Sequence, residues 1–193
     1  MTIARRLVSA LRQRCCRLAS DQRGVSAIEF ALLMPLMLTM YFGSIEVTDA
    51  ISADRQVTLV ASTVADITSE YTSVASTDVA NIMAAACAVM APFPMTNATV
   101  TLSSVTFTNG TAAVAWSFQV SGGCSTIANG RTIGSNVTSL IPAALNITGT
   151  SVLWGECTYN YKPVIGYVVT GTLSMYNEIF MRPRLSTAVT YSG

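Results

Sequence analysis

The sequence predicts an α+β protein, in which a long N-terminal transmembrane helix extends into a small periplasmic domain with an antiparallel sheet. Two observations predict the helix: an apolar run of 21 residues from Val25 to Ile45, and a helical stripe of apolar residues that continues to Tyr71. A third observation predicts the sheet, because β-rich segments separated by turn signals fill much of the second half of the chain. A chain of 193 residues has room for one modest domain besides such a helix.

The apolar run has the length of a membrane span. At about 1.5 Å per residue, a helix of this length crosses a hydrocarbon core of about 30 Å. Glu29 is its only charged residue, and Pro35 is tolerated because proline occurs in membrane helices. Six of the eleven lysine and arginine residues lie in residues 1–24. The positive-inside rule therefore predicts that this basic leader stays in the cytoplasm and that the distal domain is periplasmic.

The composition excludes several classes of function. Histidine is absent from the sequence, which removes histidine-based catalytic triads and most zinc sites. The sequence also lacks a phosphate-binding glycine-rich loop with a lysine, and it lacks a G-x-S-x-G motif. Glu156 and Lys162 are expected to be surface charges of a strand. We therefore predict no enzyme activity, no cofactor, no metal, no nucleic-acid partner and no small-molecule substrate.

A short motif opens the apolar run. Gly24 ends the basic leader, and Glu29 follows five residues later with the aromatic Phe30 beside it. An unpartnered carboxylate inside a membrane costs about 2.5–3.5 kcal/mol on insertion scales, so we expect a chain that keeps one to use it. The arrangement resembles the processing and assembly signal of type IV prepilins and pseudopilins.

Further residues around this motif narrow the resemblance. They are Arg23, Gly24, Ala27, Glu29 to Leu32, Pro35, Gly43 and Glu46, with Tyr159 to Pro163 and Met181 to Arg184 near the C-terminus as support. Together they resemble the TadE-like proteins, which are pseudopilin-type proteins of the tight-adherence (Tad, or Flp) pilus system.

This resemblance implies a role in pilus assembly. A prepilin peptidase of the inner membrane would cleave between Gly24 and Val25, where glycine lets the backbone approach the catalytic groups closely. Cleavage would turn the Val25 nitrogen into an ammonium, and the Glu29 carboxylate, about 6 Å further along the helix, could pair with that of a neighbouring subunit. Glu29 and Phe30 are thus the expected assembly residues. The implied protein is a minor pilin or pseudopilin that assists a Tad/Flp pilus in surface adherence, with other pilins and Tad assembly proteins as partners.

Alternatives stay open at this point. The apolar run could also serve as an uncleaved signal anchor or a cleaved signal peptide, although its length and the lack of a small-x-small site disfavour a signal peptide. Glu29 could lie at headgroup level and snorkel rather than pair. The chain could also be a bitopic inner-membrane protein that presents a periplasmic binding domain to a partner unrelated to pili.

The helix is expected to continue beyond the membrane. Apolar residues recur at spacings of three and four from Ala50 onward, which gives one apolar stripe on a helix. We expect residues 25–45 to span the membrane, residues 46–71 to extend the helix as a rod, and residues 72–193 to form the periplasmic domain.

Local signals divide the periplasmic domain into further elements. An Asn-Gly pair flanked by alternating segments predicts a hairpin. About four strands are expected in all. The expected elements are a helix from an N-cap at Ser76 or Thr77 to about Met90, hairpin strands 99–107 and 113–120, a loop at 124–135, a short helix at 136–145, and strands at 151–161 and 170–180.

The cysteines fit a divided topology. Cys15 and Cys16 lie in the leader, whereas three cysteines follow the apolar run. A periplasmic location permits a disulfide. Cys87 lies in an alanine-rich apolar string and is expected to be a small buried hydrophobic residue. The expected disulfide therefore joins Cys124 to Cys157.

Overall fold

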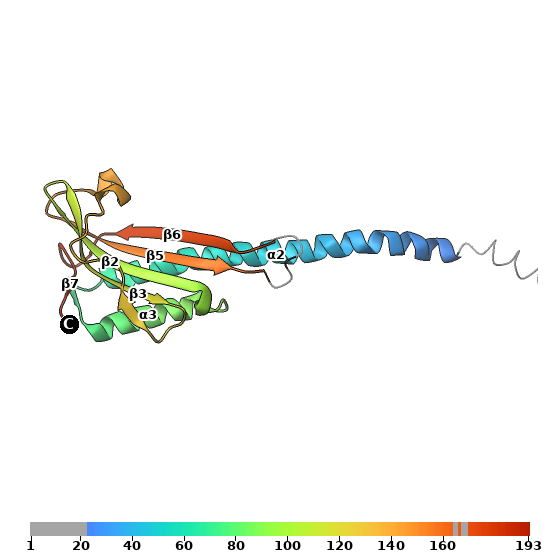
Figure 1. Ribbon diagram of the computed structural model, residues 1–193, viewed down its shortest axis with the longest axis horizontal. Coiled ribbons are helices and arrows are strands. Elements are labelled where there is room, and N and C mark those ends of the chain that lie inside the picture. Colours follow the sequence, from blue (N-terminus) through green and yellow to red (C-terminus); the bar gives the residue numbers. More distant parts are fainter. Residues whose placement is uncertain (1–22, 164–165, 167–169) are drawn as a thin grey trace, which may run out of the picture. The chain divides into compact units, whose positions relative to one another are not determined.

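The computed structural model describes residues 23–163, 166 and 170–193 (Figure 1). The chain divides into two compact units after Ile45. The described part of the first unit is helical, and the second unit, Glu46–Gly193, contains the sheet. The predicted leader, with Cys15 and Cys16, lies outside the described residues except for its last two positions.

Helix α2 (Arg23–Ser69) is one helix of 47 residues that includes Pro35. Its second-unit portion buries a face of small and β-branched residues, as the apolar stripe predicts. This face packs against the domain's own sheet and contributes to its main core. The fully buried apolar residues of this face are Ala53, Val57, Val60, Ala61, Val64 and Ala65.

Helix α3 (Ser76–Met90) packs into the same core as α2, through Val79, Ile82, Met83, Ala86 and Met90. The predicted helix is confirmed, but the N-cap is Ala75 rather than Ser76 or Thr77. The Ala75 N–H donates to the Asp78 carboxylate at 2.9 Å, so an acidic side chain in the first turn caps the helix. At the other end, the Gln56 side chain of α2 donates to the carbonyls of Val89 and Ala91, each at 2.9 Å.

The main sheet has five strands in the order β4-β3-β2-β5-β6, and all neighbours are antiparallel. A short parallel pair, β1 with β7, brings the C-terminal segment beside the start of α3. The strands are β1 (Ser73–Val74), β2 (Ala98–Thr108), β3 (Thr111–Ser121), β4 (Ile127–Asn129), β5 (Ser151–Tyr161), β6 (Leu173–Met181) and β7 (Thr190–Tyr191), with 3-10 turns η1 (Met95–Asn97), η2 (Thr138–Leu140) and η3 (Ala143–Leu145).

The hairpin prediction is confirmed, because β2 and β3 pair around Asn109 and Gly110, which both have positive φ. The predicted strands at 151–161 and 170–180 correspond to β5 and β6. Two expectations were wrong. The expected loop at 124–135 contains the short strand β4, and the expected helix at 136–145 is only the turns η2 and η3, separated by Pro142.

A register shift between β2 and β3 lets the two faces of the sheet each contribute to a separate hydrophobic cluster. Ser104 pairs with Trp116, whereas the next residue, Val105, pairs with Val114, so β3 carries one extra residue, Ala115. The bulge turns Val114 to the face opposite Trp116. Trp116 joins the core under the helices, while Val114 joins a second cluster on the other face. This second cluster includes Val105, Phe107, Ala112, Val137, Ile141, Val152 and Trp154.

Helix α2 approaches strand β5 most closely at Gly155. A Cβ at this position would overlap the backbone carbonyl oxygen of Ala61 and would crowd Val64 and Ala65. The Ala61 oxygen belongs to the main chain, so it cannot move aside by changing a rotamer. Glycine at 155 therefore sets how closely the helix lies on the sheet.

Replacement of Gly155 by alanine should destabilise the domain. The added methyl group must push α2 away from β5, and such overpacking typically costs about 1–3 kcal/mol. Chemical denaturation of the full-length protein in detergent, followed by tryptophan fluorescence, measures the change. Thr158→Ala, in the same strand, is the control and should cost less. Equal stability of Gly155→Ala and the wild type would contradict the close approach.

Candidate functional site

The first candidate site is the portion of α2 in the first unit. Its large apolar side chains are exposed, among them Leu32 at 76% and Met40 at 71%. The helix is long and apolar enough to cross a membrane, and none of its most apolar 18-residue stretch is buried. These side chains need an apolar environment that the described part of the chain does not itself supply.

The predicted processing position lies in the first turn of α2. Gly24 has no atom within 4 Å of where a Cβ would be, and Val25 is exposed. The bond between Gly24 and Val25 is therefore sterically open among the described residues.

The predicted assembly residues lie one turn further along. Glu29 and Phe30 are exposed, and no hydrogen bond or ion pair to the Glu29 side chain is found among the described residues. Its helical neighbours Ile28, Leu32 and Leu33 are apolar and exposed. A carboxylate in an apolar setting gains most from a cation outside its own helix.

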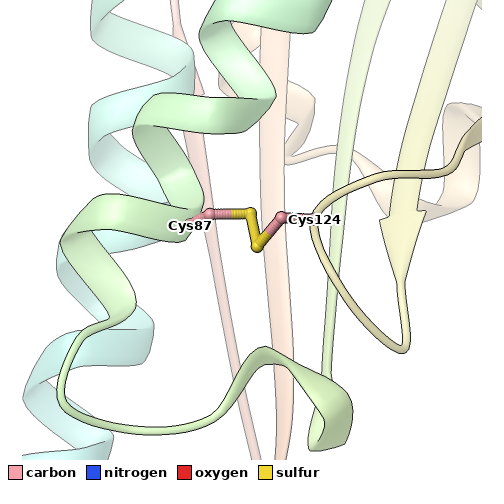
Figure 2. Close-up of a disulfide and its surroundings, with 2 residues drawn as sticks. All are labelled: Cys87 and Cys124. Atoms are coloured by element: carbon pink, nitrogen blue, oxygen red, sulfur yellow. A yellow bond between two sulfur atoms is a disulfide. The ribbon is translucent and has the colours of Figure 1, made fainter.

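The disulfide prediction was wrong in its pairing. Cys124 is bonded to Cys87, not to Cys157, with a Cα–Cα distance of 6.1 Å (Figure 2). Cys87 lies on α3 and Cys124 in the loop after β3, so the bond fastens this loop to the helix (Figure 2). Sequence reasoning treated Cys87 as a buried hydrophobic residue, whereas it is only half-buried.

Cys157 is the free cysteine of the described residues, and it is fully buried in the main core. It lies on β5 opposite Val100 and Asn177, with its side chain among apolar residues. Burial raises the pKa of this thiol from 9.0 to about 12. The thiol therefore stays protonated and acts as a small apolar side chain.

The second candidate site is a polar network on the sheet face opposite the helices. Arg131 forms a two-point ion pair with Glu156, through contacts of 2.8 and 3.1 Å. The guanidinium carbon also lies 3.9 Å from the centre of the Trp154 ring. Glu156 is only 8% exposed, which corrects its interpretation as a surface charge. Such a bidentate pair fixes orientation as well as charge.

Two residues of β6 complete this network. The Tyr176 hydroxyl lies 2.8 Å from a Glu178 oxygen and 3.0 Å from a Glu156 oxygen, and the Trp154 N–H donates to Glu178 at 3.0 Å. Burial, with the adjacent carboxylates of Glu178 and Glu156, raises the pKa of Tyr176, so its hydroxyl remains a donor. Because each member is engaged by another, the network fastens the segment around Arg131 to β5 and β6.

Sequence reasoning missed this network. Arg131 lies in a predicted loop, and its partners come from two strands that are adjacent only in the folded sheet. One signal was present: Glu156 interrupts a strand whose other residues from Ser151 to Cys157 are uncharged.

These observations define a class of protein. An exposed apolar helix near the N-terminus, continued into an α+β domain, fits a single-pass membrane protein. Residues 24–66 match the family described as TadE-like protein, which confirms the resemblance over this segment and supports a membrane protein associated with the Tad pilus. The comparison with curated proteins gives no match, and the comparison with solved structures gives none either.

The cysteines of the second unit should differ sharply in chemistry. Peptide mapping without reduction should recover Cys87 joined to Cys124, and Cys157 as a free thiol. Iodoacetamide reacts with thiolates, and the raised pKa keeps Cys157 protonated, so native protein at pH 8 should label there only after unfolding. The contribution of this buried thiol to the free energy of unfolding also falls as pH rises from 9.0, where the thiol of the unfolded chain loses its proton, to about 12. Rapid labelling of Cys157 in folded protein would contradict its burial.

Proposed function

We propose that this protein is a membrane-anchored pseudopilin or minor pilin that assists assembly of a Tad/Flp pilus used in surface adherence. The observation that carries the proposal is the coincidence of the TadE-like match with α2. The matched residues 24–66 cover the exposed apolar helix, Glu29, and most of the helix face that packs on the sheet. A role in assembly uses this helix as a contact surface, and it requires no catalytic group on the chain.

The proposed orientation puts the leader in the cytoplasm and the second unit in the periplasm. The six basic residues up to Gly24 support this orientation through the positive-inside rule. The disulfide between Cys87 and Cys124 supports it independently, because such bonds persist in the periplasm and are rare in the cytoplasm.

The proposed assembly step is an ion pair between chains. After a prepilin peptidase removes residues 1–24, the new ammonium at Val25 would be the nearest cation of fixed position for a Glu29 carboxylate. Pairing with the Val25 ammonium of an adjacent subunit would offset the burial of both charges and would set the axial stagger of neighbouring helices. The exposure of Glu29, and the absence of a partner for it among the described residues, support pairing between chains.

A bitopic protein that presents a binding domain to an unrelated partner is the second candidate. It shares the anchor and the periplasmic domain, but it needs neither cleavage nor an available Glu29. Processing therefore separates the two functions.

Processing should occur after Gly24 in cells that contain the matching peptidase. Intact mass of membrane-extracted protein should correspond to a chain that begins at Val25. Gly24→Leu should retain the leader, because a bulky side chain keeps the scissile backbone from the catalytic groups. Ala27→Leu, three residues beyond the scissile bond, is the matched control and should still be cleaved. A wild-type protein that keeps Met1, or normal cleavage of Gly24→Leu, would leave only the bitopic function.

Glu29→Ala should separate insertion from assembly. Loss of a charge from the span eases membrane insertion by up to about 3 kcal/mol, so the variant should insert and be cleaved normally, yet fail to support pili. Glu29→Asp should be partly defective because its carboxylate reaches less far. Thr39→Ala is the matched control, since the Thr39 hydroxyl donates to the Leu36 carbonyl of its own helix. Wild-type numbers of pili on the Glu29→Ala strain, counted by electron microscopy, would support snorkelling instead.

A further inference from the structure

Strand β6 leaves one edge of the main sheet open. It pairs with β5 over nine residues without a shift in register. Its opposite side makes no other backbone hydrogen bond among the described residues. Each residue of β6 except Met175 is at least partly exposed. With respect to residues 23–163, 166 and 170–193, the outward N–H and C=O groups of this edge are therefore available to another strand.

The other edge of the sheet is protected. Strand β4 has only three residues, and the rest of β3 is covered by the segment 130–137. Within this segment, the Gly134 N–H donates to Val114 at 2.8 Å, and the Val137 N–H donates to Ala112 at 2.9 Å. Strand β6 has no lysine, proline or bulge, which are devices that commonly block edge strands.

The outer side of the β6 edge carries an uncompensated negative charge. Glu156 is neutralised by Arg131, but Glu178 has no basic partner among the described residues. One Glu178 oxygen accepts from Trp154 and Tyr176, while no residue that the structure describes donates to the other oxygen. Tyr176 beside it is 51% exposed. A carboxylate next to an exposed aromatic ring favours a cation.

The inner side of the same edge is apolar. Asn177 donates to Thr58 at 2.9 Å, which places β6 beside that part of α2. Ile51 lies seven residues earlier, almost two turns, so it shares the helix face of Thr58 and is 50% exposed. Leu59 is 51% exposed, and Leu173 at the start of β6 is 40% exposed. Apolar side chains of an added strand can pack against these residues.

We propose that the β6 edge binds an extended segment of a partner protein, which adds a sixth strand to the sheet. Apolar and polar side chains alternate along this segment, and the apolar ones face Ile51 and Leu173. On the polar side, a lysine or arginine of the segment lies against Glu178 and Tyr176. Backbone hydrogen bonds supply affinity in this mode, and the alternate side chains supply specificity.

A second copy of the chain fits this edge poorly. Asn177 contacts Thr58 and Arg184 donates its N–H to Ser69 at 2.8 Å, so β6 runs in the same direction as α2. Two-fold pairing of β6 with itself would be antiparallel and would place the Glu46 ends of the two α2 segments at opposite ends of the joined sheet. Two copies anchored in one membrane need both ends on the same side.

A peptide tests the proposal on full-length protein in detergent micelles. The probe is a fluorescent nine-residue peptide that alternates serine with valine and carries lysine in place of the central serine. It should slow hydrogen exchange of the β6 amides, and it should bind about two- to fivefold tighter than the same peptide with a central glutamate. Methylation of alternate backbone nitrogens should abolish binding, because it removes the donors that an added strand needs.

Two charge variants locate the effect. Glu178→Gln keeps an acceptor for Trp154 and Tyr176, and it should remove the preference for the lysine peptide. Glu70→Gln, near the far end of α2, is the matched control and should keep that preference. The proposal is overturned if the methylated peptide binds as tightly as the unmethylated one, or if hydrogen exchange of the β6 amides is unchanged at saturating peptide. It is also overturned if the β6 amides are protected without peptide because the protein dimerises. None of these outcomes depends on cleavage or on pili.

Discussion

The structure depends on the close packing of α2 against strand β5. Gly155 provides the space, since any larger residue would meet the backbone of Ala61. With the helix at this distance, Thr58 reaches Asn177 on β6 and Gln56 reaches the last carbonyls of α3. Arg184 then pairs with Asp66 and Glu70 near the end of α2, so the C-terminal segment is fixed to the same helix. The close approach of Gly155 to the backbone of Ala61 thus positions the polar contacts around it.

Much of the fold could be predicted from local sequence. The Asn109-Gly110 turn, the alternating strands on either side of it, and the stripe along α2 each depend on residues close in the chain. The elements that sequence reasoning missed depend on distant partners. Strand β4 is too short to show a pattern and exists only because β3 offers it an edge. The segment after Asn136 forms 3-10 turns because Pro142 interrupts it and its apolar residues cap a second core that the bulge in β3 creates.

The candidate sites divide in the same way. The Gly24 and Glu29 motif is contiguous, so it could be proposed from the sequence, and the TadE-like match covers the segment that contains it. The disulfide could not, because Cys87 and Cys124 meet only when α3 is placed beside the loop after β3. The Arg131 network was hidden for a related reason. The four other members of the network lie on β5 and β6. A charged or aromatic residue on a strand shows the same sequence pattern whether it faces a buried polar site or solvent.

The single helix that joins anchor and domain has a mechanical consequence. If a growing or retracting assembly pulls on the anchor, the tension enters the domain along α2. Because β6 runs in the same direction as α2, that tension loads the helix–sheet contacts in shear, so many contacts resist together. A strand at the end of a chain would instead be peeled away one hydrogen bond at a time. The disulfide at Cys87 acts outside this path, and it would keep α3 and the loop after β3 together even if α2 slipped along the sheet.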